Sequence, residues 1–398
     1  MLQSTLARVL KKIVPISLEE IDQYSFMLFG SGGYAKKIYQ NYSSRIIAIV
    51  EHENRLVETK NIFSIKCLPP KEAKGNVLIG SDIGNFQFNQ LKALANSDHS
   101  EIEKILLLDP YIESRNIEQQ PPDKTILLLE HASGVSRHGP LLDNFKRYLN
   151  HQGLAVTSLC PLTLYYYPQY TDSRDVIFFS GQRELYDIGR DIFKEKRSTY
   201  MEYGFFPQYE HFYMDKIGVN QDSSLMVDDL DWVEKSHLQN VEKVKKHFLI
   251  NFRHEAANYV LVPLQVPDDP NIMKCSRFKN GMQEFIDYIV AYYPTTQSIV
   301  FKAHPKDPYR KTYNYWGKTS SEVPFLELLS CAKHVHGITS STLYEAVLAG
   351  VDVILEGNSI LAQHTHQKHK LLAAIIDRQV SIMEKDMSFW LQRYSNIQ

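Results

Sequence analysis

The chain has 398 residues, of which 43% are apolar, and its formal net charge is −2. This length predicts about two or three domains, and the apolar share is too high for a disordered chain. The lack of a basic excess argues against a nucleic-acid partner, and no run of about eighteen apolar residues would span a bilayer. The four cysteines show no metal or disulfide spacing, so we expect a reduced, cytoplasmic protein.

Residues 1–118 are predicted to form an N-terminal Rossmann-like domain. The amphipathic segment from Leu6 to Val14 is typical of a packed first helix or of a short interfacial one. A strand, Ser25–Phe29, leads into the sequence GSGGYA at Gly30–Ala35, and Glu51 follows the next strand. This matches the G-x-G-x-x-A pattern, with an acid at the ribose position of dinucleotide folds. A nicotinamide site and a purely structural glycine turn both remain open.

A stretch rich in Pro, Gln and Asp, Gln119–Asp123, indicates a linker, and residues 124–245 are predicted to form a second Rossmann-like domain. Near the end of this domain, Glu202 precedes a tyrosine and then Gly204. A carboxylate between an apolar strand end and a glycine turn can present a catalytic acid to a substrate. A structural turn is equally consistent with this spacing.

Residues 246–398 are predicted to form a third Rossmann-like domain, which carries the main candidate site. Its first strand runs into Gln265 and then into a turn with two aspartates, of which Asp269 is the second. A later apolar run, Ser298–Phe301, is followed by Lys302 and then by His304. Both side chains should lie at the carboxyl edge of the sheet, where open α/β sheets bind ligands.

The last motif of this domain is a predicted strand-to-helix turn. It consists of Thr339, Ser340, Ser341 and Thr342, and Glu345 lies one helical turn further on. Free N–H groups and the positive end of the helix dipole favour a phosphate at such a helix start. Taken alone, the hydroxyls would indicate only an N-cap. Taken together with the cation of Lys302 and the imidazole of His304, they indicate a nucleotide-sugar site.

Five motifs resemble motifs of the capsule polysaccharide synthesis family and occur in the same order. They are Glu202–Phe205, Ser224–Asp229, Val260–Ile272, Lys302–Pro305 and Thr339–Gly350. That family contains bacterial β-Kdo transferases that use CMP-Kdo. The resemblance implies an α/β protein with a GT-B-like pair of Rossmann-like domains, preceded by the additional N-terminal one. The second predicted domain would then be the acceptor side, and the third would bind the CMP-sugar.

The resemblance also implies roles for individual residues. Asp269 matches an aspartate implicated as the nucleophile of a retaining, double-displacement transfer. Glu202 would act as acid or base toward the acceptor hydroxyl, and His304 would stabilise the departing CMP phosphate. Substrate-binding side chains are expected at Gln265, Lys302, Thr339, Ser340, Ser341, Thr342 and Glu345, the last of these at the cytidine ribose. We expect neither a cofactor nor a metal, because a cation, an imidazole and a helix dipole stand in place of a metal clamp.

The sequence leaves two other functions open. Bacterial GT-B sialyltransferases share several of these motifs and also use CMP-sugars, but the centre of their acidic turn is an aspartate base. Here that position is Tyr203, and a tyrosine with a pKa of about 10 is a poor base at neutral pH. A CMP-Neu5Ac transferase and a non-catalytic dinucleotide- or sugar-nucleotide-binding protein therefore remain as alternatives.

The expected partners follow from the Kdo transferase resemblance. They are a CMP-sugar donor and a glycan acceptor that we expect to be lipid-linked, and no nucleic acid is expected. The growing glycan would belong to a capsule, an O-antigen or a lipopolysaccharide. Such an enzyme would work in the cytoplasm, with peripheral contact to the inner membrane face or to other glycan-assembly enzymes.

Overall fold

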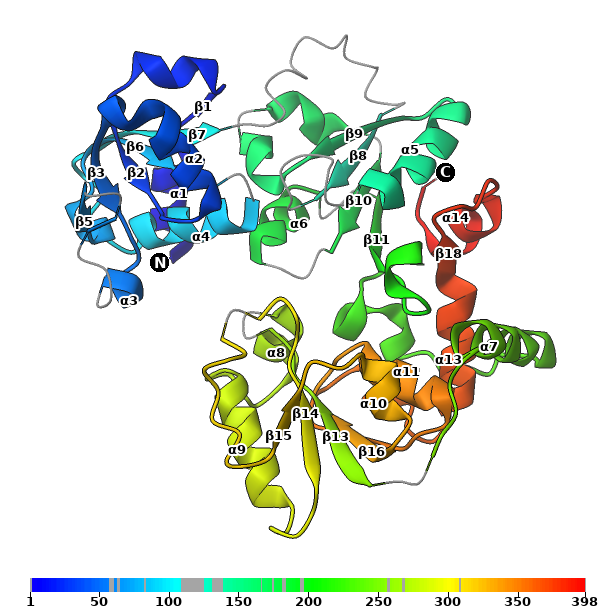
Figure 1. The fold of residues 1–398 in the computed structure, drawn as a ribbon. Coiled ribbons are helices and arrows are strands. Elements are labelled where there is room, and N and C mark those ends of the chain that lie inside the picture. Colours follow the sequence, from blue (N-terminus) through cyan, green and yellow to red (C-terminus); the bar gives the residue numbers. More distant parts are fainter. Residues whose placement is uncertain are drawn as a thin grey trace. The chain divides into compact units, whose positions relative to one another are not determined.

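The computed structural model has three β-sheets with helices packed around them (Figure 1). The residues that it describes are 2–56, 61–62, 65–81, 84–108, 125–130, 139–165, 167–173, 175–180, 184–193, 197–255, 258–266, 269–307 and 309–397. The predicted linker Gln119–Asp123 lies outside these residues. The chain divides into two compact units. Unit 1 comprises Met1–Gly139, Leu149–Phe179 and Arg183–Arg197, and unit 2 comprises Pro140–Tyr148, Ser180–Gln182 and Ser198–Gln398.

The sheet at the start of unit 1 has the strand order β1-β7-β6-β2-β3-β5-β4. Its strands are β1 (Ile13–Ile16), β2 (Phe26–Phe29), β3 (Ile46–Val50), β4 (Asn61–Ile62), β5 (Ile65–Leu68), β6 (Gly75–Ile79) and β7 (Ile102–Leu108). Its helices are α1 (Leu2–Leu10), α2 (Gly33–Tyr42), α3 (Glu53–Leu56) and α4 (Gly84–Ala95). All pairs are parallel except β4 with β5. The chain order reverses between β2 and β6, which is the topological switch point of a Rossmann-like sheet.

Burial explains why these segments form a parallel sheet. All four residues of β2 are buried, as expected of a strand that is covered on both faces. Helix α2 packs on the sheet through Ala35 and Ile38, and the small Ala35 lets the helix approach closely. Helix α1 buries Val9 and Leu10, so the first part of this segment is the packed helix that was predicted, whereas Ile13 and Val14 lie in strand β1.

The middle sheet has the order β18-β12-β11-β10-β8-β9. Its strands are β8 (Thr125–Leu129), β9 (Ala155–Leu159), β10 (Asp175–Phe179), β11 (Arg197–Tyr203), β12 (His211–Asp215) and β18 (Gln379–Ser381), and the nearby helices are α5 (Gly139–His151) and α6 (Asp187–Phe193). The pairs of β8 with β9 and β10 are parallel, whereas β12 is antiparallel to β11 and to β18. This departs from the all-parallel sheet of a Rossmann-like domain. Residues 204–210 are too short a link between β11 and β12 for a crossover helix, so the chain turns back on itself.

The third sheet, in unit 2, is entirely parallel and has the order β15-β14-β13-β16-β17. Its strands are β13 (Tyr259–Pro263), β14 (Ile299–Lys302), β15 (Thr319–Ser321), β16 (Ala332–Gly337) and β17 (Val353–Leu355). The helices of this part are α7 (Lys235–Phe248), α8 (Pro270–Cys275), α9 (Met282–Tyr292), α10 (Phe325–Leu329), α11 (Thr342–Ala349), α12 (Ile360–Gln363), α13 (Lys368–Arg378) and α14 (Ser388–Tyr394).

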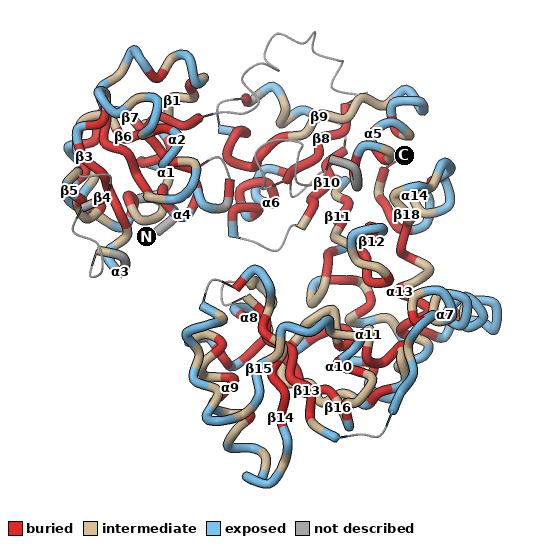
Figure 2. The backbone as a smooth tube through the Cα atoms, viewed as in Figure 1, coloured by how far each residue is buried: buried red, intermediate tan, exposed pale blue. Residues whose placement is uncertain are grey.

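Alternate residues of β13 point to two different cores, which fixes the register of the third sheet. Val260 and Val262 pack in the cluster that contains Phe285 and Ile286 of α9. Leu261 packs in the other cluster, with residues of α11 and α13. Strand β13 is therefore buried on both faces, and Figure 2 shows the contrast with the exposed outer side of α7.

The predicted α/β class is confirmed by the three sheets and their helices. The GT-B-like pairing of domains and the boundaries at residues 1–118, 124–245 and 246–398 stay predictions. Within the described part of the chain, no helix has the length and apolar character needed to cross a bilayer.

The first glycine of the GSGGYA loop generates a stability prediction. Gly30 has φ +104°, and a Cβ added there would lie 2.5 Å from Nε2 of Gln90. Gly32 has φ −68° and open space around a Cβ. We expect Gly30→Ala to lower the free energy of unfolding by about 2 kcal/mol or more, and Gly32→Ala to change it by less than about 1 kcal/mol. Urea denaturation of both variants checks this, and equal losses would contradict the assigned conformations.

Candidate functional site

The predicted site residues gather at the carboxyl edge of the third sheet. Parallel strands end at the same edge, so the segments that follow β13, β14 and β16 are neighbours there. Gln265 and Asp269 follow β13, His304 follows β14, and the Thr339–Thr342 turn follows β16. The chain order reverses between β13 and β16, and ligands of open α/β sheets bind at such a switch point. All of these residues belong to unit 2.

Gln265 joins two of these segments through its side-chain amide. Its Nε2 lies 3.1 Å from Oδ2 of Asp269 and 3.2 Å from Oγ1 of Thr339, and it donates to both. Its Oε1 accepts from the backbone N–H of Thr339 at 3.1 Å. Because Gln265 is only 5% exposed, these bonds replace water that the amide would otherwise bind. The acidic turn after β13 is thereby fixed relative to the turn after β16.

Asp269 is held at both carboxylate oxygens. It is the N-cap of α8, where Oδ1 accepts from the N–H of Asn271 at 2.9 Å, while Oδ2 accepts from Gln265. The side chain is half-buried. Capping explains the rigid orientation of this carboxylate. Each oxygen retains a further lone pair, so the group can still act on a substrate.

Burial favours the neutral form of the His304 ring, because it lowers the pKa of the imidazole. The N–H of Lys306 donates to Nδ1 at 3.2 Å, so the proton of the neutral ring is on Nε2. Burial lowers the pKa of His304 below its ordinary value, and the charge of Lys306 adds to this effect, against the opposing charges of Asp269 and Asp307. His304 thus offers an N–H donor within the electrostatic influence of the Asp269 carboxylate.

Lys302 is not drawn into this group of residues. Its ammonium donates to the backbone oxygen of Glu322 at 3.2 Å, beyond the edge strand β15. The charge of Lys306 lowers the pKa of His304 more than the charge of Lys302 does. The sequence had not singled out Lys306. The substrate-binding role of Lys302 stays a prediction.

The turn after β16 has its hydroxyls at the start of α11. Oγ of Ser340 lies 2.8 Å from Oγ1 of Thr342, and the N-cap residue Ser341 makes no side-chain capping bond. Gly357 packs behind the turn, where an added Cβ would lie 2.5 Å from Cγ2 of Thr339. The turn is thus closely supported from behind, and its three partly exposed hydroxyls lie at the positive end of the helix dipole.

Glu345 lies one turn further along α11. Burial raises the pKa of its carboxyl to about 7, and no neighbouring charge contributes to this shift. A buried carboxyl without a cationic partner destabilises the folded state when it ionises. Such a group is common at functional sites, which is consistent with its predicted place at the ribose.

Glu202 is on β11, and aromatic residues connect its segment to the His304 loop. Its Oε1 accepts from Oγ of Ser180 at 2.7 Å and from the N–H of Tyr203 at 3.0 Å. The ring of Tyr203 lies 5.2 Å from that of Tyr209, and the ammonium of Lys306 is 5.7 Å from the Tyr209 ring centre. Tyr209 is a second residue that the sequence did not single out. The acid and base role of Glu202 stays a prediction.

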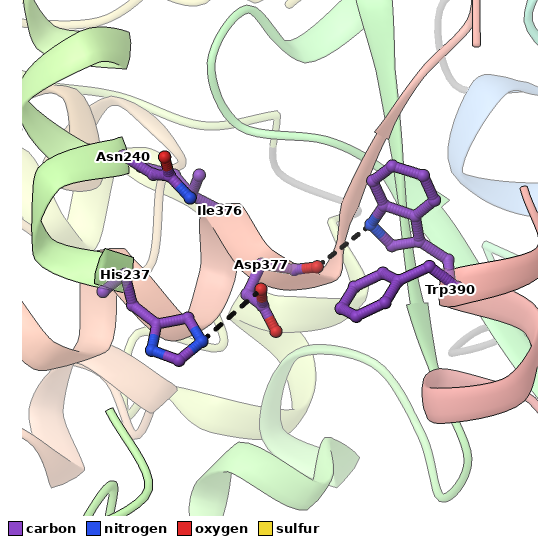
Figure 3. Close-up of a pocket in the computed structure, with 7 residues that line it drawn as sticks. His237, Asn240, Ile376, Asp377 and Trp390 are labelled. Atoms are coloured by element: carbon purple, nitrogen blue, oxygen red, sulfur yellow. Dashed lines mark hydrogen bonds and ion pairs between the residues drawn. The ribbon is translucent and has the colours of Figure 1, made fainter. Parts of the chain in front are cut away.

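One cavity of unit 2 lies apart from the candidate site. It has a volume of about 110 Å³ and lies among α7, α13 and α14 (Figure 3). Trp390 donates to the backbone oxygen of Asp377 at 3.0 Å, and Nε2 of His237 lies 3.9 Å from Oδ1 of Asp377. Pockets for nucleotide-sized ligands are usually several hundred Å³, so this cavity does not compete with the sheet edge as the nucleotide site.

Comparison with known proteins supports the motif resemblance. Residues 206–369 match the family described as "Capsule polysaccharide biosynthesis protein", so the predicted resemblance is confirmed over that part of the chain. No curated protein sequence matches the chain. Two similar solved structures are chains of Thermosulfurimonas dismutans KpsC. One is a "beta Kdo 2,7 transferase", with 17% identity, a TM-score of 0.49 and coverage of 66% of this chain and 94% of that one. The other is a "beta Kdo 2,4 transferase", with 14% identity, a TM-score of 0.47 and coverage of 64% and 90%.

The carboxyl of Glu345 generates a pH-dependent stability prediction. Because folding raises its pKa from 4.5 to about 7, its contribution to stability is fully present below pH 4.5 and is lost as the pH rises to 7. We expect Glu345→Gln to raise the free energy of unfolding at about pH 8 by at most roughly 3 kcal/mol, with little effect at about pH 4.5. Denaturant titrations at both pH values measure this. A variant that is no more stable than the wild type at the higher pH would refute the assigned burial.

Proposed function

Because residues 206–369 match the capsule polysaccharide biosynthesis family, we propose that this chain is a glycosyltransferase of bacterial surface glycan synthesis. Its donor is CMP-β-Kdo, and its product is a growing capsule, O-antigen or lipopolysaccharide chain that carries a new Kdo residue. One observation carries the proposal: Gln265 bonds both Asp269 and Thr339. It thereby ties a carboxylate to a hydroxyl-rich helix start at the switch point of a parallel sheet.

The CMP phosphate would lie at the start of α11, against the hydroxyls of Ser340, Ser341 and Thr342. The Nε2–H of His304 would donate to the same phosphate, and Lys306 would add positive charge beside it. These groups stabilise the charge that develops on the phosphate as the sugar departs. Glu345 would accept from the ribose hydroxyls, further along the same helix.

Transfer would proceed by two displacements at the anomeric carbon of Kdo. In the first, a carboxylate oxygen of Asp269 attacks this carbon and the bond to CMP breaks, with oxocarbenium character in the transition state. In the second, the acceptor hydroxyl attacks the same carbon, Glu202 takes its proton and the bond to Asp269 breaks. Two inversions at one carbon give net retention of the anomeric configuration.

The sialyltransferase alternative uses the same type of donor phosphate site. Tyr203 disfavours it, because that turn then offers no carboxylate base at its centre. Parallel assays with CMP-Kdo and CMP-Neu5Ac separate the two functions. The acceptor is expected to be lipid-linked and to be modified at the cytoplasmic face of the inner membrane.

The proposed nucleophile can be trapped. Asp269→Asn keeps a residue that caps helices well, so we expect a folded protein that binds CMP and whose turnover falls by about a thousandfold or more. Wild-type protein quenched after mixing with CMP-Kdo, without acceptor, should gain the mass of one Kdo on the peptide that contains Asp269. Asp268→Asn is the matched control and should keep the adduct. An inverted product, or near-normal turnover of Asp269→Asn, would rule out this mechanism.

The phosphate contact of His304 can be measured by calorimetry. We expect His304→Ala to weaken CMP binding by about 1–3 kcal/mol, the range for a hydrogen bond to a charged group. His369→Ala, at an exposed position of α13, is the control and should bind CMP normally. The titrations are made in excess EDTA, because we expect binding and turnover to need no metal. Unchanged affinity in His304→Ala would remove this residue from the site.

A further inference from the structure

The N-terminal sheet has a switch point of its own, in addition to the one in unit 2. The proposed transferase function does not use it. The GSGGYA loop leaves the end of β2, the strand next to which the chain order reverses. In unit 2, the candidate site follows β13, which has the corresponding place in its own sheet. The loop is outside residues 206–369, the range of the family match.

The glycines at this edge of the sheet, three in the loop and Gly80 after the neighbouring strand β6, divide into a tightly packed set and an open set. Gly30 and Gly80 face protein atoms, because an added Cβ would lie 2.5 Å from Nε2 of Gln90 in the first case and 2.5 Å from the backbone oxygen of Phe29 in the second. Gly32 and Gly33 have no atom within 4 Å of an added Cβ. The loop is thus fixed from behind, and its front is open space.

Helix α2 begins at this open front. Its N-cap is Gly32, so no side chain caps the free N–H groups of the first turn. Lys36 and Lys37 are exposed in the next turn of the ten-residue helix. Free N–H groups, the positive end of the helix dipole and nearby ammonium groups together favour a phosphate.

A buried acceptor beside the loop is a separate sign of a ligand. Gln90 is only 7% exposed, and its amide lies against Gly30, the first glycine of the loop. Its Nε2 donates to the backbone oxygen of Phe29 at 3.0 Å, whereas its Oε1 has no hydrogen-bond partner among the described residues. A buried acceptor without a donor destabilises the protein, and a ligand that brings a donor removes that penalty.

Glu51 supplies a group that recognises ribose. It follows β3, the strand beside β2, and it is 1% exposed. Its Oε2 accepts from Oγ of Ser31 in the glycine loop at 2.6 Å, and its Oε1 accepts from the N–H of His52 at 2.9 Å. The carboxylate therefore lies beside the loop and already holds a hydroxyl there. A ribose hydroxyl can take the place of the Ser31 hydroxyl, while a 2′-phosphate would be repelled.

We propose that the N-terminal sheet binds a nucleoside diphosphate, either free or as part of a dinucleotide or nucleotide sugar. The diphosphate lies over Gly32 and Gly33 at the start of α2, and the ribose hydroxyls bond to Glu51. This site is independent of the CMP-sugar site of unit 2.

The test uses the full chain and isothermal titration calorimetry with ADP, UDP, CDP and NAD as probes. We expect at least one of them to bind with a stoichiometry of about one. Gly32→Asp should weaken that binding by about tenfold or more, because its carboxylate faces the diphosphate. Gly32→Asn is the matched neutral control, and both residues are good N-caps, so both variants should fold. Gly32→Asn should retain more of the affinity than Gly32→Asp does.

The ribose contact is tested with ligands instead of a disruptive variant. The 2′-deoxy form of the bound nucleotide should lose affinity by at least about fivefold. NADP should bind more weakly than NAD. The proposal is overturned if none of the four probes binds at about millimolar concentration, or if Gly32→Asp and wild type bind alike. It is also overturned if His304→Ala abolishes the binding, because the ligand then occupies unit 2. None of these results depends on CMP-Kdo transfer.

Discussion

Unit 2 depends on one buried ion pair, between Arg378 at the end of α13 and Asp215 at the end of β12. Nη1 of Arg378 lies 2.8 Å from Oδ2 of Asp215, with exposures of 5% and 0%. Two desolvated charges cost less free energy when hydrogen bonds meet their other positions, and here all but Nε of Arg378 among its nitrogens have a partner within the described residues. Asp215 accepts further bonds from Ser224, and Asp228 bonds both Arg378 and the indole of Trp232. Ser224 and Asp228 of the Ser224–Asp229 motif therefore complete the hydrogen bonding around this ion pair.

The N-terminal sheet and the third sheet each have one point where the chain order reverses, between β2 and β6 in the first and between β13 and β16 in the second. The loops after β2 and β13 are thus placed by topology alone at a position where a ligand can approach the strand ends. What differs is the chemistry of the loop. Open glycines follow β2, whereas an amide and a carboxylate that are bonded to each other follow β13.

Much of the fold could be predicted from the sequence, because buried parallel strands are continuous apolar runs between polar turns. The antiparallel strands β11, β12 and β18 could not, since only pairing reveals that the chain turns back after Tyr203. At the site, strand ends correctly placed Gln265 and His304 at one edge. They could not show that Lys302 leans toward β15, or that the exposed Lys306 lies over the Tyr209 ring. Side-chain direction at a strand end depends on neighbours that are distant in sequence.

The side-chain hydrogen bonds of Gln265 also bear on how far the two loops that it joins can be changed independently. An amide has a donor end and an acceptor end, and here each end faces its complement: Asp269 and the Thr339 hydroxyl at Nε2, the Thr339 N–H at Oε1. A substitution that removes the acceptor at position 269 or at Thr339 takes a hydrogen bond from Nε2. The positions of the two loops are therefore coupled through one side chain. Replacing either loop by another sequence would keep the present arrangement only if the groups that bond Gln265 were kept as well.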